Sequence, residues 1–333
     1  MTISLSRFSL YNGFSPSYRY SPVHSNNIWL PRSESFLFFF WLRIFILLAF
    51  FSFSGCTFSM PVNIVAAENF YGDLAKQIGG KHVVITSILN NPNQDPHLFE
   101  ASPKTARALH DAQIVIYNGA NYDPWVSRLL SASKKPERRV LIVANLIGKK
   151  TGDNPHLWYK PETMLTVACA FDEELSRIDP EHKAEFDANL IRFIESLKPF
   201  FEKISAIRIK YHGQPITSTE PIADYLVDAL GLKMHNKRFQ IATMNSTEAR
   251  LSDIAAFEKD LRNHLVRALI YNSQTEEPMT KQMLKIAHNA HIPIVSVTET
   301  QPENKTFQQW QFEQLEALEY ALGTSSNRLF QTQ

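Results

Sequence analysis

From Val62 onward the sequence alternates short runs rich in Val and Ile with amphipathic stretches of helical periodicity. Two neighbouring parallel strands need a long crossover connection, which is usually a helix. Strict alternation of strand and helix therefore predicts a parallel sheet covered by helices on both faces. In the first half of the chain, the predicted strands are 62–67, 82–89, 114–118 and 139–145, and the predicted helices are 70–78, 103–110 and 122–131.

A long helical stretch follows, from about residue 181 to residue 211. Asp179-Pro180 is a plausible start for it, and Pro199 inside it should bend or interrupt it. A helix of this length reaches roughly 45 Å, which is enough to cross between two lobes. Apolar residues form one stripe along it, at Phe186, Leu190, Phe193, Leu197, Phe200, Ile204, Ile207 and Tyr211.

The alternation of strands and helices restarts after this stretch, and 333 residues are enough for two separate cores. The prediction is an α/β protein of two lobes, each a mostly parallel sheet flanked by helices, joined by one long linker helix. A single crossing helix should stiffen the hinge, so that closure is a small tilt. In the second half the predicted strands are 215–219, 239–244, 268–272 and 293–298, and the predicted helices are 221–230, 247–263, 278–289 and 306–322.

The region before the first lobe has the composition of a targeting segment. Residues 36–53 are almost wholly apolar, and the run from Ile44 has about the length of a signal-peptide core but is short for a membrane span. Ser54-Gly55-Cys56 follows and is similar to a bacterial lipobox, in which the cysteine thiol is acylated. Because Phe53 stands where leucine is usual, an uncleaved anchor with Arg43 near the cytoplasmic face remains open. Both interpretations place the rest of the chain in the periplasm or on the outer face of the membrane.

Charge and cysteine content exclude two classes of protein. Lys and Arg number 34 against 33 Asp and Glu, and no basic stripe is visible, which argues against a nucleic-acid partner. Two cysteines are too few for a disulfide framework. Cys169 lies in a predicted helix, where we expect a small buried residue. The predicted division is 1–60 for the extension and anchor, 61–180 for the first lobe, 181–212 for the linker helix and 213–333 for the second lobe.

Four potential metal ligands follow predicted strands, where open α/β sheets place their binding crevice. His97 follows the second strand and His156 follows the fourth, each directly after a proline. Glu220 ends the first strand of the second lobe and Glu299 ends the last one. Each lobe thus contributes two ligands, as a site closed between the lobes requires.

The chemistry of these four side chains suits a divalent first-row metal. Two imidazoles with two carboxylates are harder than three imidazoles and favour Mn²⁺ or Fe²⁺, while the Irving–Williams order keeps Zn²⁺ binding tight. Glu276 and Glu277 also follow a predicted strand and are an alternative source of the fourth ligand. Asp95 and Glu100 are placed to orient the imidazole of His97. The other histidines in predicted helices and turns, which we expect to be solvated, are His110, His182, His212, His264, His288 and His291.

The long central helix and several short segments form a recognisable set. The segments are Asp95-Pro96-His97, Phe99-Glu100, Pro155-His156-Leu157-Trp158, Ile292-Pro293-Ile294-Val295 and Thr298-Glu299. Over about residues 62–325 this set resembles the zinc/manganese-type solute-binding proteins of ABC transporters.

The resemblance implies a ligand set and a function. The two histidine ligands of that family fall on His97 and His156, its third ligand falls on Glu220, and its fourth, commonly aspartate, falls on Glu299. Asn154 stands where the family often has aspartate, and the His-rich loop of many zinc-specific members is absent. Such a protein captures manganese or zinc, or iron, outside the cytoplasm and delivers it to a membrane permease that works with a cytoplasmic ATPase.

Two other functions are alternatives to metal delivery. A surface adhesin on the same fold is one alternative, and nothing in the sequence discriminates it. A metallohydrolase is the other, but a catalytic zinc keeps an open position beside a general base, and the chain has neither an H-E-x-x-H nor a G-x-S-x-G element. We therefore expect a protein without enzymatic activity.

Overall fold

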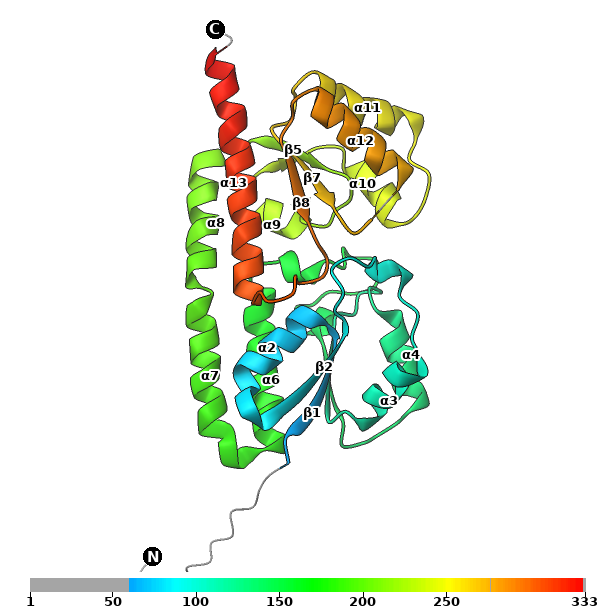
Figure 1. Cartoon of the computed structure of the whole chain (residues 1–333), viewed down its shortest axis with the longest axis vertical. Helices are drawn as coiled ribbons and strands as arrows, with labels where there is room; N and C mark the ends of the chain where they lie inside the picture. The colour runs from blue at the N-terminus through cyan, green and yellow to red at the C-terminus, as the bar shows by residue number, and fades with distance from the viewer. Residues whose placement is uncertain (1–59, 276, 332–333) are drawn as a thin grey trace, which may run out of the picture. The chain divides into compact units, whose positions relative to one another are not determined.

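The computed structural model describes residues 60–275 and 277–331, with side chains described as far as residue 324. It contains two four-stranded sheets, ordered β2-β1-β3-β4 and β6-β5-β7-β8, and every strand pair is parallel. Helices flank each sheet (Figure 1). The predicted α/β architecture of two lobes is confirmed. The predicted anchor and Cys56 lie outside the described residues.

In the first lobe, β1 lies between β2 and β3 and is buried on both faces. Ile64 and Ala66 belong to a core shared with α2 and α6, while Val65 and Ala67 belong to a second core shared with α3 and α4. This two-sided burial explains why the strand reads as a continuous apolar run. The elements are β1 (Val62–Glu68), α2 (Asn69–Gly79), β2 (Val83–Leu89), α3 (Pro103–Asp111), β3 (Ile114–Tyr117), α4 (Pro124–Ala132), β4 (Arg139–Ile142), α5 (Val143–Leu146) and α6 (Thr163–Ile178).

The second lobe repeats this plan with a smaller core on one face. Phe239 and Phe257 meet there with ring centroids 4.9 Å apart, whereas Ile216 and Val295 join the large core that continues from the first lobe. Its elements are β5 (Pro215–Ser218), α9 (Asp224–Ala229), β6 (Lys233–Met234), α10 (Lys237–Met244), α11 (Leu251–Arg262), β7 (Leu269–Asn272), α12 (Pro278–Asn289), β8 (Ile294–Val297) and α13 (Phe307–Gln331).

Two predicted strands differ from the structure. Residues 239–244 were predicted as a strand but form most of α10, and β6 takes the edge position instead. A short apolar run does not reveal its period, and here Phe239 is buried while Ile241 is 49% exposed. The predicted strand 139–145 stops at Ile142, because its partner β3 ends at Tyr117, and the next residues form α5.

The predicted linker consists of two helices, α7 (Lys183–Ser196) and α8 (Lys198–Tyr211). The break falls at Leu197, and Pro199 occupies the first turn of α8, where its missing N–H is not needed. The predicted interruption at this proline is therefore present.

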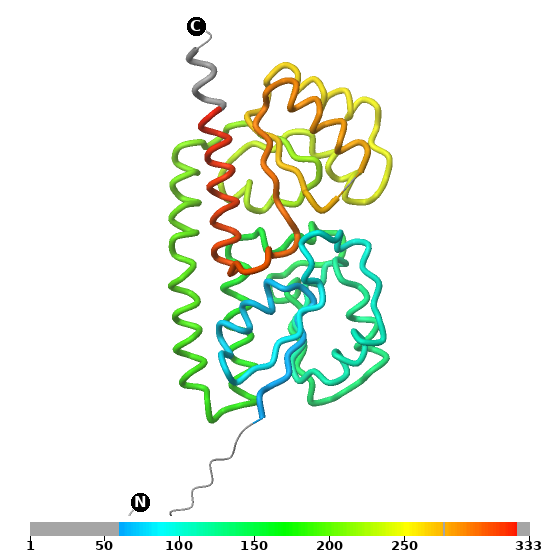
Figure 2. The backbone as a smooth tube through the Cα atoms, in the orientation of Figure 1, coloured from blue at the N-terminus to red at the C-terminus, as the bar shows by residue number. Residues whose placement is uncertain are grey.

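A second connection between the lobes was not predicted. After β8 the chain returns to the first lobe, where Gln301 N donates to Asn69 Oδ1 at 3.0 Å and Phe307 N donates to Asp73 Oδ2 at 2.8 Å. Helix α13 then packs along α8 (Figures 1 and 2). The lobes are thus joined by α7–α8 and by the segment that leads into α13.

Cys169 is exposed on α6, so the prediction that it is buried is wrong. The buried face of that helix is formed by residues spaced three and four apart, such as Met164, Val167 and Phe171, and position 169 falls outside that stripe.

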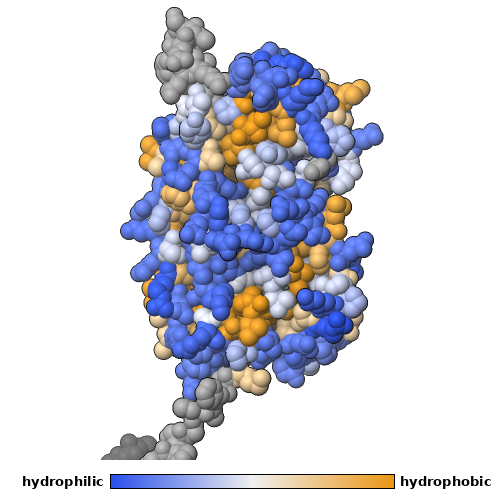
Figure 3. All heavy atoms as spheres, viewed as in Figure 1, coloured by the Kyte–Doolittle hydropathy of each residue, from blue (hydrophilic) through white to orange (hydrophobic). Residues whose placement is uncertain are grey.

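The face of the molecule in Figure 3 is mostly hydrophilic, with hydrophobic patches set apart from one another. Among the helices of the described residues, none has the length and apolar character needed to cross a membrane.

Candidate metal centre

His97 lies in a short turn after β2, the 3₁₀ helix η2 (Pro96–Leu98). Asp95 caps this turn, because its Oδ1 accepts a hydrogen bond from His97 N at 2.8 Å, and Pro96 stiffens the first position. Asp95 therefore positions the backbone of His97, whereas we had expected it to orient the ring. Glu100, the other expected partner, is exposed. The imidazole of His97 remains 41% exposed and lies edge-on to the ring of Tyr122.

His156 precedes the 3₁₀ helix η3 (Leu157–Tyr159) and is completely buried. Asn154 fixes its ring. The Nδ2 of Asn154 donates to Pro221 O at 2.6 Å, so its Oδ1 faces His156 and lies 2.8 Å from Nδ1. Nδ1 therefore carries a proton, and Nε2 is the nitrogen left to bind a ligand. That Nε2 is buried and has no hydrogen-bond partner.

Glu299 follows β8 and brings a carboxylate from the second lobe to both histidines of the first. Its Oε1 lies 3.3 Å from His97 Nε2 and 3.9 Å from His156 Nε2, and the latter is too long for a hydrogen bond. Tyr122 donates its hydroxyl to Oε2 at 2.7 Å, and Asn272 donates Nδ2 to Oε1 at 2.6 Å. Ligand atoms of His97, His156 and Glu299 all lie within 4.8 Å of one another.

The backbone around Glu299 is fixed by Gln274, which follows β7. Gln274 Oε1 accepts hydrogen bonds from Glu299 N at 2.6 Å and Thr300 N at 3.0 Å. Its Nε2 donates to Gln94 O at 2.8 Å, in the loop that leads to His97. One amide side chain thus ties the two loops together across the lobes.

Glu220 follows β5 and is 4% exposed, but it is not among the three residues grouped within 4.8 Å. Its Oε1 is buried without a hydrogen-bond partner. Burial, followed by the nearby charge of Glu299, raises the pKa of Glu220 to about 7, while the charges of His156 and His97 act in the opposite direction. Of the two alternative carboxylates, Glu277 precedes α12 outside the group, and Glu276 lies outside the described residues.

The charges of His97 and Glu299 stabilise each other. The hydrogen bond to Glu299 raises the pKa of His97 to about 9, against the opposing effect of burial. Burial alone would raise the pKa of Glu299, but the imidazoles of His156 and His97 together lower it well below its usual range. Without metal at neutral pH, His97 is therefore a cation paired with the Glu299 anion. This pair stabilises the fold most between about pH 4.5 and pH 6.5; the contribution is lost as the pH rises through about 9, and also as the pH falls towards the lowered pKa of Glu299.

A buried network behind the site positions Tyr122. Asp123 accepts hydrogen bonds from Asn118 N at 2.7 Å and Gly119 N at 2.9 Å, which shapes a loop whose residues 119–121 all have positive φ. Burial, and then the adjacent Asp123, raise the pKa of Glu68 well above its usual value, so the two carboxyl groups do not both carry charge at neutral pH.

Sequence reasoning missed Tyr122, Asn272 and Gln274 as residues of the site. Asn272 ends β7 and Tyr122 lies in the loop after β3. The same rule that selected the ligands, that binding residues gather at the carboxyl ends of parallel strands, would have selected these two had it been applied to polar neutral side chains.

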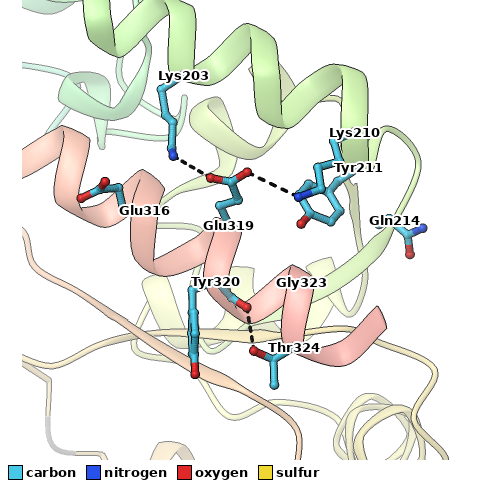
Figure 4. A pocket seen from close by; sticks show the side chains of 9 residues that line it. All are labelled: Lys203, Lys210, Tyr211, Gln214, Glu316, Glu319, Tyr320, Gly323 and Thr324. Atoms are coloured by element: carbon cyan, nitrogen blue, oxygen red, sulfur yellow. Dashed lines mark hydrogen bonds and ion pairs between the residues drawn. The ribbon is translucent and has the colours of Figure 1, made fainter. Parts of the chain in front are cut away.

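A separate cavity of about 650 Å³ lies between α8 and α13 (Figure 4). Its charged residues neutralise one another, because Glu319 pairs with Lys203 at 2.6 Å and with Lys210 at 3.8 Å. Its lining contains no histidine. The donor chemistry of a transition-metal site is therefore found in the His97–His156–Glu299 group and not in this cavity.

Comparisons with known proteins agree with this geometry. The family model described as "Zinc-uptake complex component A periplasmic" matches residues 64–321. The "Manganese ABC transporter substrate-binding lipoprotein scaA" of Streptococcus gordonii is 25% identical over 277 residues, which cover 75% of this chain and 86% of that protein.

Solved structures show the same fold. The "periplasmic zinc binding protein TroA" of Treponema pallidum superposes with a TM-score of 0.65 at 16% identity, over 79% of this chain and 99% of that one. The "laminin-binding protein Lbp" of Streptococcus pyogenes gives 0.63 at 18% identity over the same shares. Because the family model spans well over half of the sequence, the chain belongs to the family of periplasmic zinc-uptake complex component A.

Proposed function

We propose that this protein captures a divalent transition metal between its two lobes and delivers it to a membrane permease driven by a cytoplasmic ATPase. The observation that carries the proposal is the buried Nε2 of His156, which has no hydrogen-bond partner although Glu299 and His97 lie beside it. A buried ring nitrogen without a partner is costly, and a cation bound to it removes that cost. His97, His156, Glu220 and Glu299 are the proposed ligands.

Three of the four proposed ligands, His97, His156 and Glu299, need little rearrangement to bind a metal. Ligand atoms about 2.0–2.2 Å from one ion in a tetrahedral shell lie about 3.3 Å from one another. The carboxylate of Glu299 is already 3.3 Å from His97 Nε2 and 3.9 Å from His156 Nε2. Tyr122 and Asn272 hold that carboxylate in place, so the metal replaces the proton of His97 without reorienting Glu299.

The proposed cargo is Mn²⁺ or Zn²⁺. Two imidazoles and two carboxylates suit manganese, and Fe²⁺ has similar preferences, whereas Zn²⁺ binds any such set tightly. The names of the relatives include both manganese and zinc. Four protein ligands fill a tetrahedral shell and leave no position for a reacting water, so we infer a binding role and no catalysis.

The proposed location is the periplasm or the outer face of a bacterial membrane, with Cys56 as the acylated anchor. The support is the small-residue motif before Cys56 and the word lipoprotein in the names of several relatives. A relative named for laminin binding shares the fold, but at 18% identity this likeness carries no argument about adhesion by this chain.

Alanine substitution of either histidine should abolish tight metal binding. We expect His97→Ala and His156→Ala each to weaken binding more than tenfold in a competition titration with a metal indicator, because each loses a ligand. His110→Ala, an exposed histidine of the same lobe, is the matched control and should bind like the wild type. Both site variants binding within about threefold of wild type would reject the site.

Glu299→Gln should weaken binding markedly while preserving shape, since it removes the charge that offsets the cation. Mn²⁺ should lose more affinity than Zn²⁺, because manganese depends more on hard oxygen donors. Glu277→Gln is the matched control at the alternative carboxylate. A silent Glu299→Gln together with a weakened Glu277→Gln in the same titrations would transfer the ligand role to Glu277.

Metal binding should release protons. At pH 7.5 the pKa of about 9 keeps His97 protonated without metal, so binding must displace that proton, and affinity should rise about tenfold per pH unit between pH 7.5 and 9. Below about pH 7 the release should increase, because Glu220 must also lose a proton. Calorimetric titrations in buffers of different ionisation enthalpy measure this number, and zero release at pH 7.5 would contradict the proposed ion pair.

A further inference from the structure

A second group of metal-ligating side chains lies near the amino end of β2, whereas the first site lies beyond its carboxyl end. His82 ends the 3₁₀ helix η1 (Gly80–His82) just before β2, whereas His97 follows that strand. Asp179 and His182 flank and end η4 (Pro180–His182), at the corner between α6 and α7. A strand of seven residues is about 23 Å long, so these residues are well separated from the first site. We call His82, Asp179, His182 and Glu185 the corner cluster.

The side chains of the corner cluster converge. Ligand atoms of His82, Asp179 and His182 lie within 4.8 Å of one another. His182 Nδ1 is 2.8 Å from Asp179 Oδ2, and His82 Nε2 is 2.9 Å from Glu185 Oε2. The two imidazole rings stack with centroids 3.8 Å apart. Two imidazoles and two carboxylates thus meet at one place, which is the same donor set as in the first site.

The imidazoles and Asp179 of the corner cluster are more buried than the members of an ordinary surface ion pair. The side chain of Asp179 is 6% exposed, that of His82 is 12% and that of His182 is 27%, although we had expected His182 to be solvated. The ring of Phe186 packs against both imidazoles, at 5.6 Å from His82 and 6.3 Å from His182. Glu185, at 42%, forms the open rim and also pairs with Lys81 at 3.5 Å.

The distances fit a metal after a small adjustment. In a zinc shell neighbouring ligand atoms lie about 3.3 Å apart, so the two contacts of 2.8 and 2.9 Å need to open by about half an ångström. Because all ligand atoms of His82, Asp179 and His182 lie within 4.8 Å of one another, no separation among them has to close by more than about 1.5 Å.

We propose that His82, Asp179 and His182 form a second site for a divalent transition metal of the zinc type, with Glu185 or water completing the shell. The Irving–Williams order makes Zn²⁺ a more tightly bound occupant of such a donor set than Mn²⁺. A metal there ties the start of β2 to the corner between α6 and α7, and so stabilises the first lobe. The corner cluster shares no residue with the cargo site, and its occupant does not leave with the cargo.

Zinc stoichiometry tests this proposal. In equilibrium dialysis the wild-type protein should bind two equivalents of Zn²⁺, and His82→Gln/His182→Gln should bind one. His97→Ala/His156→Ala should also bind one, and that one should disappear when all four substitutions are combined. His110→Gln, at an exposed histidine of the same lobe, should leave two equivalents.

Different results would reject the two proposed sites. If His82→Gln/His182→Gln retains the wild-type stoichiometry, the corner site is rejected, whereas a wild-type value in His97→Ala/His156→Ala rejects the cargo site alone. A second measurement does not depend on any variant. Crystals of the wild-type protein grown with zinc should show anomalous scattering between His82 and His182, and its absence from zinc-saturated crystals would overturn the proposal.

Discussion

The candidate site depends on one buried carboxylate that reaches from the second lobe to the first. Glu299 is 1% exposed, and its oxygens accept hydrogen bonds from Tyr122 of one lobe and Asn272 of the other. A buried negative charge must be neutralised nearby. In the metal-free protein the imidazolium of His97 does this at 3.3 Å, and we propose that a metal cation does it in the loaded protein. Proton and metal then compete for the same place.

The rest of the fold holds the proposed ligands in place. Two connections join the lobes, α7–α8 and the segment into α13, and Gln274 links the loop of Glu299 to the loop that leads to His97. Asn154 fixes the orientation of the His156 ring before any ligand binds. Ligands held in this way lose little conformational freedom on binding, which favours affinity. We therefore expect metal release to require a change that disturbs these contacts. Protonation of the ligands, or movement of one lobe when the permease binds it, would be such a change.

Sequence alone predicted the fold and the proposed ligands because both follow from local rules. Periodicity identified the strands, and the ends of parallel strands gave His97, His156, Glu220 and Glu299. Residues 239–244 were predicted wrongly because a short apolar run fits a helix or a strand. Cys169 was predicted wrongly because its position relative to the buried stripe of α6 was not considered. The return of the chain through Gln301 to Asn69 and the corner cluster depend on residues about a hundred or more positions apart, which no local pattern reveals.

The most direct test of the central claim is a crystal structure of the metal-loaded protein with anomalous diffraction measured at the metal edge. The account predicts one ion in the crevice, with His97 Nε2, His156 Nε2 and an oxygen of Glu299 each about 2.0–2.2 Å away, or slightly farther for manganese. Glu299 should keep its hydrogen bonds to Tyr122 or Asn272. A bound cargo ion that contacts neither histidine, with Glu299 still paired to a protonated His97, would contradict the account.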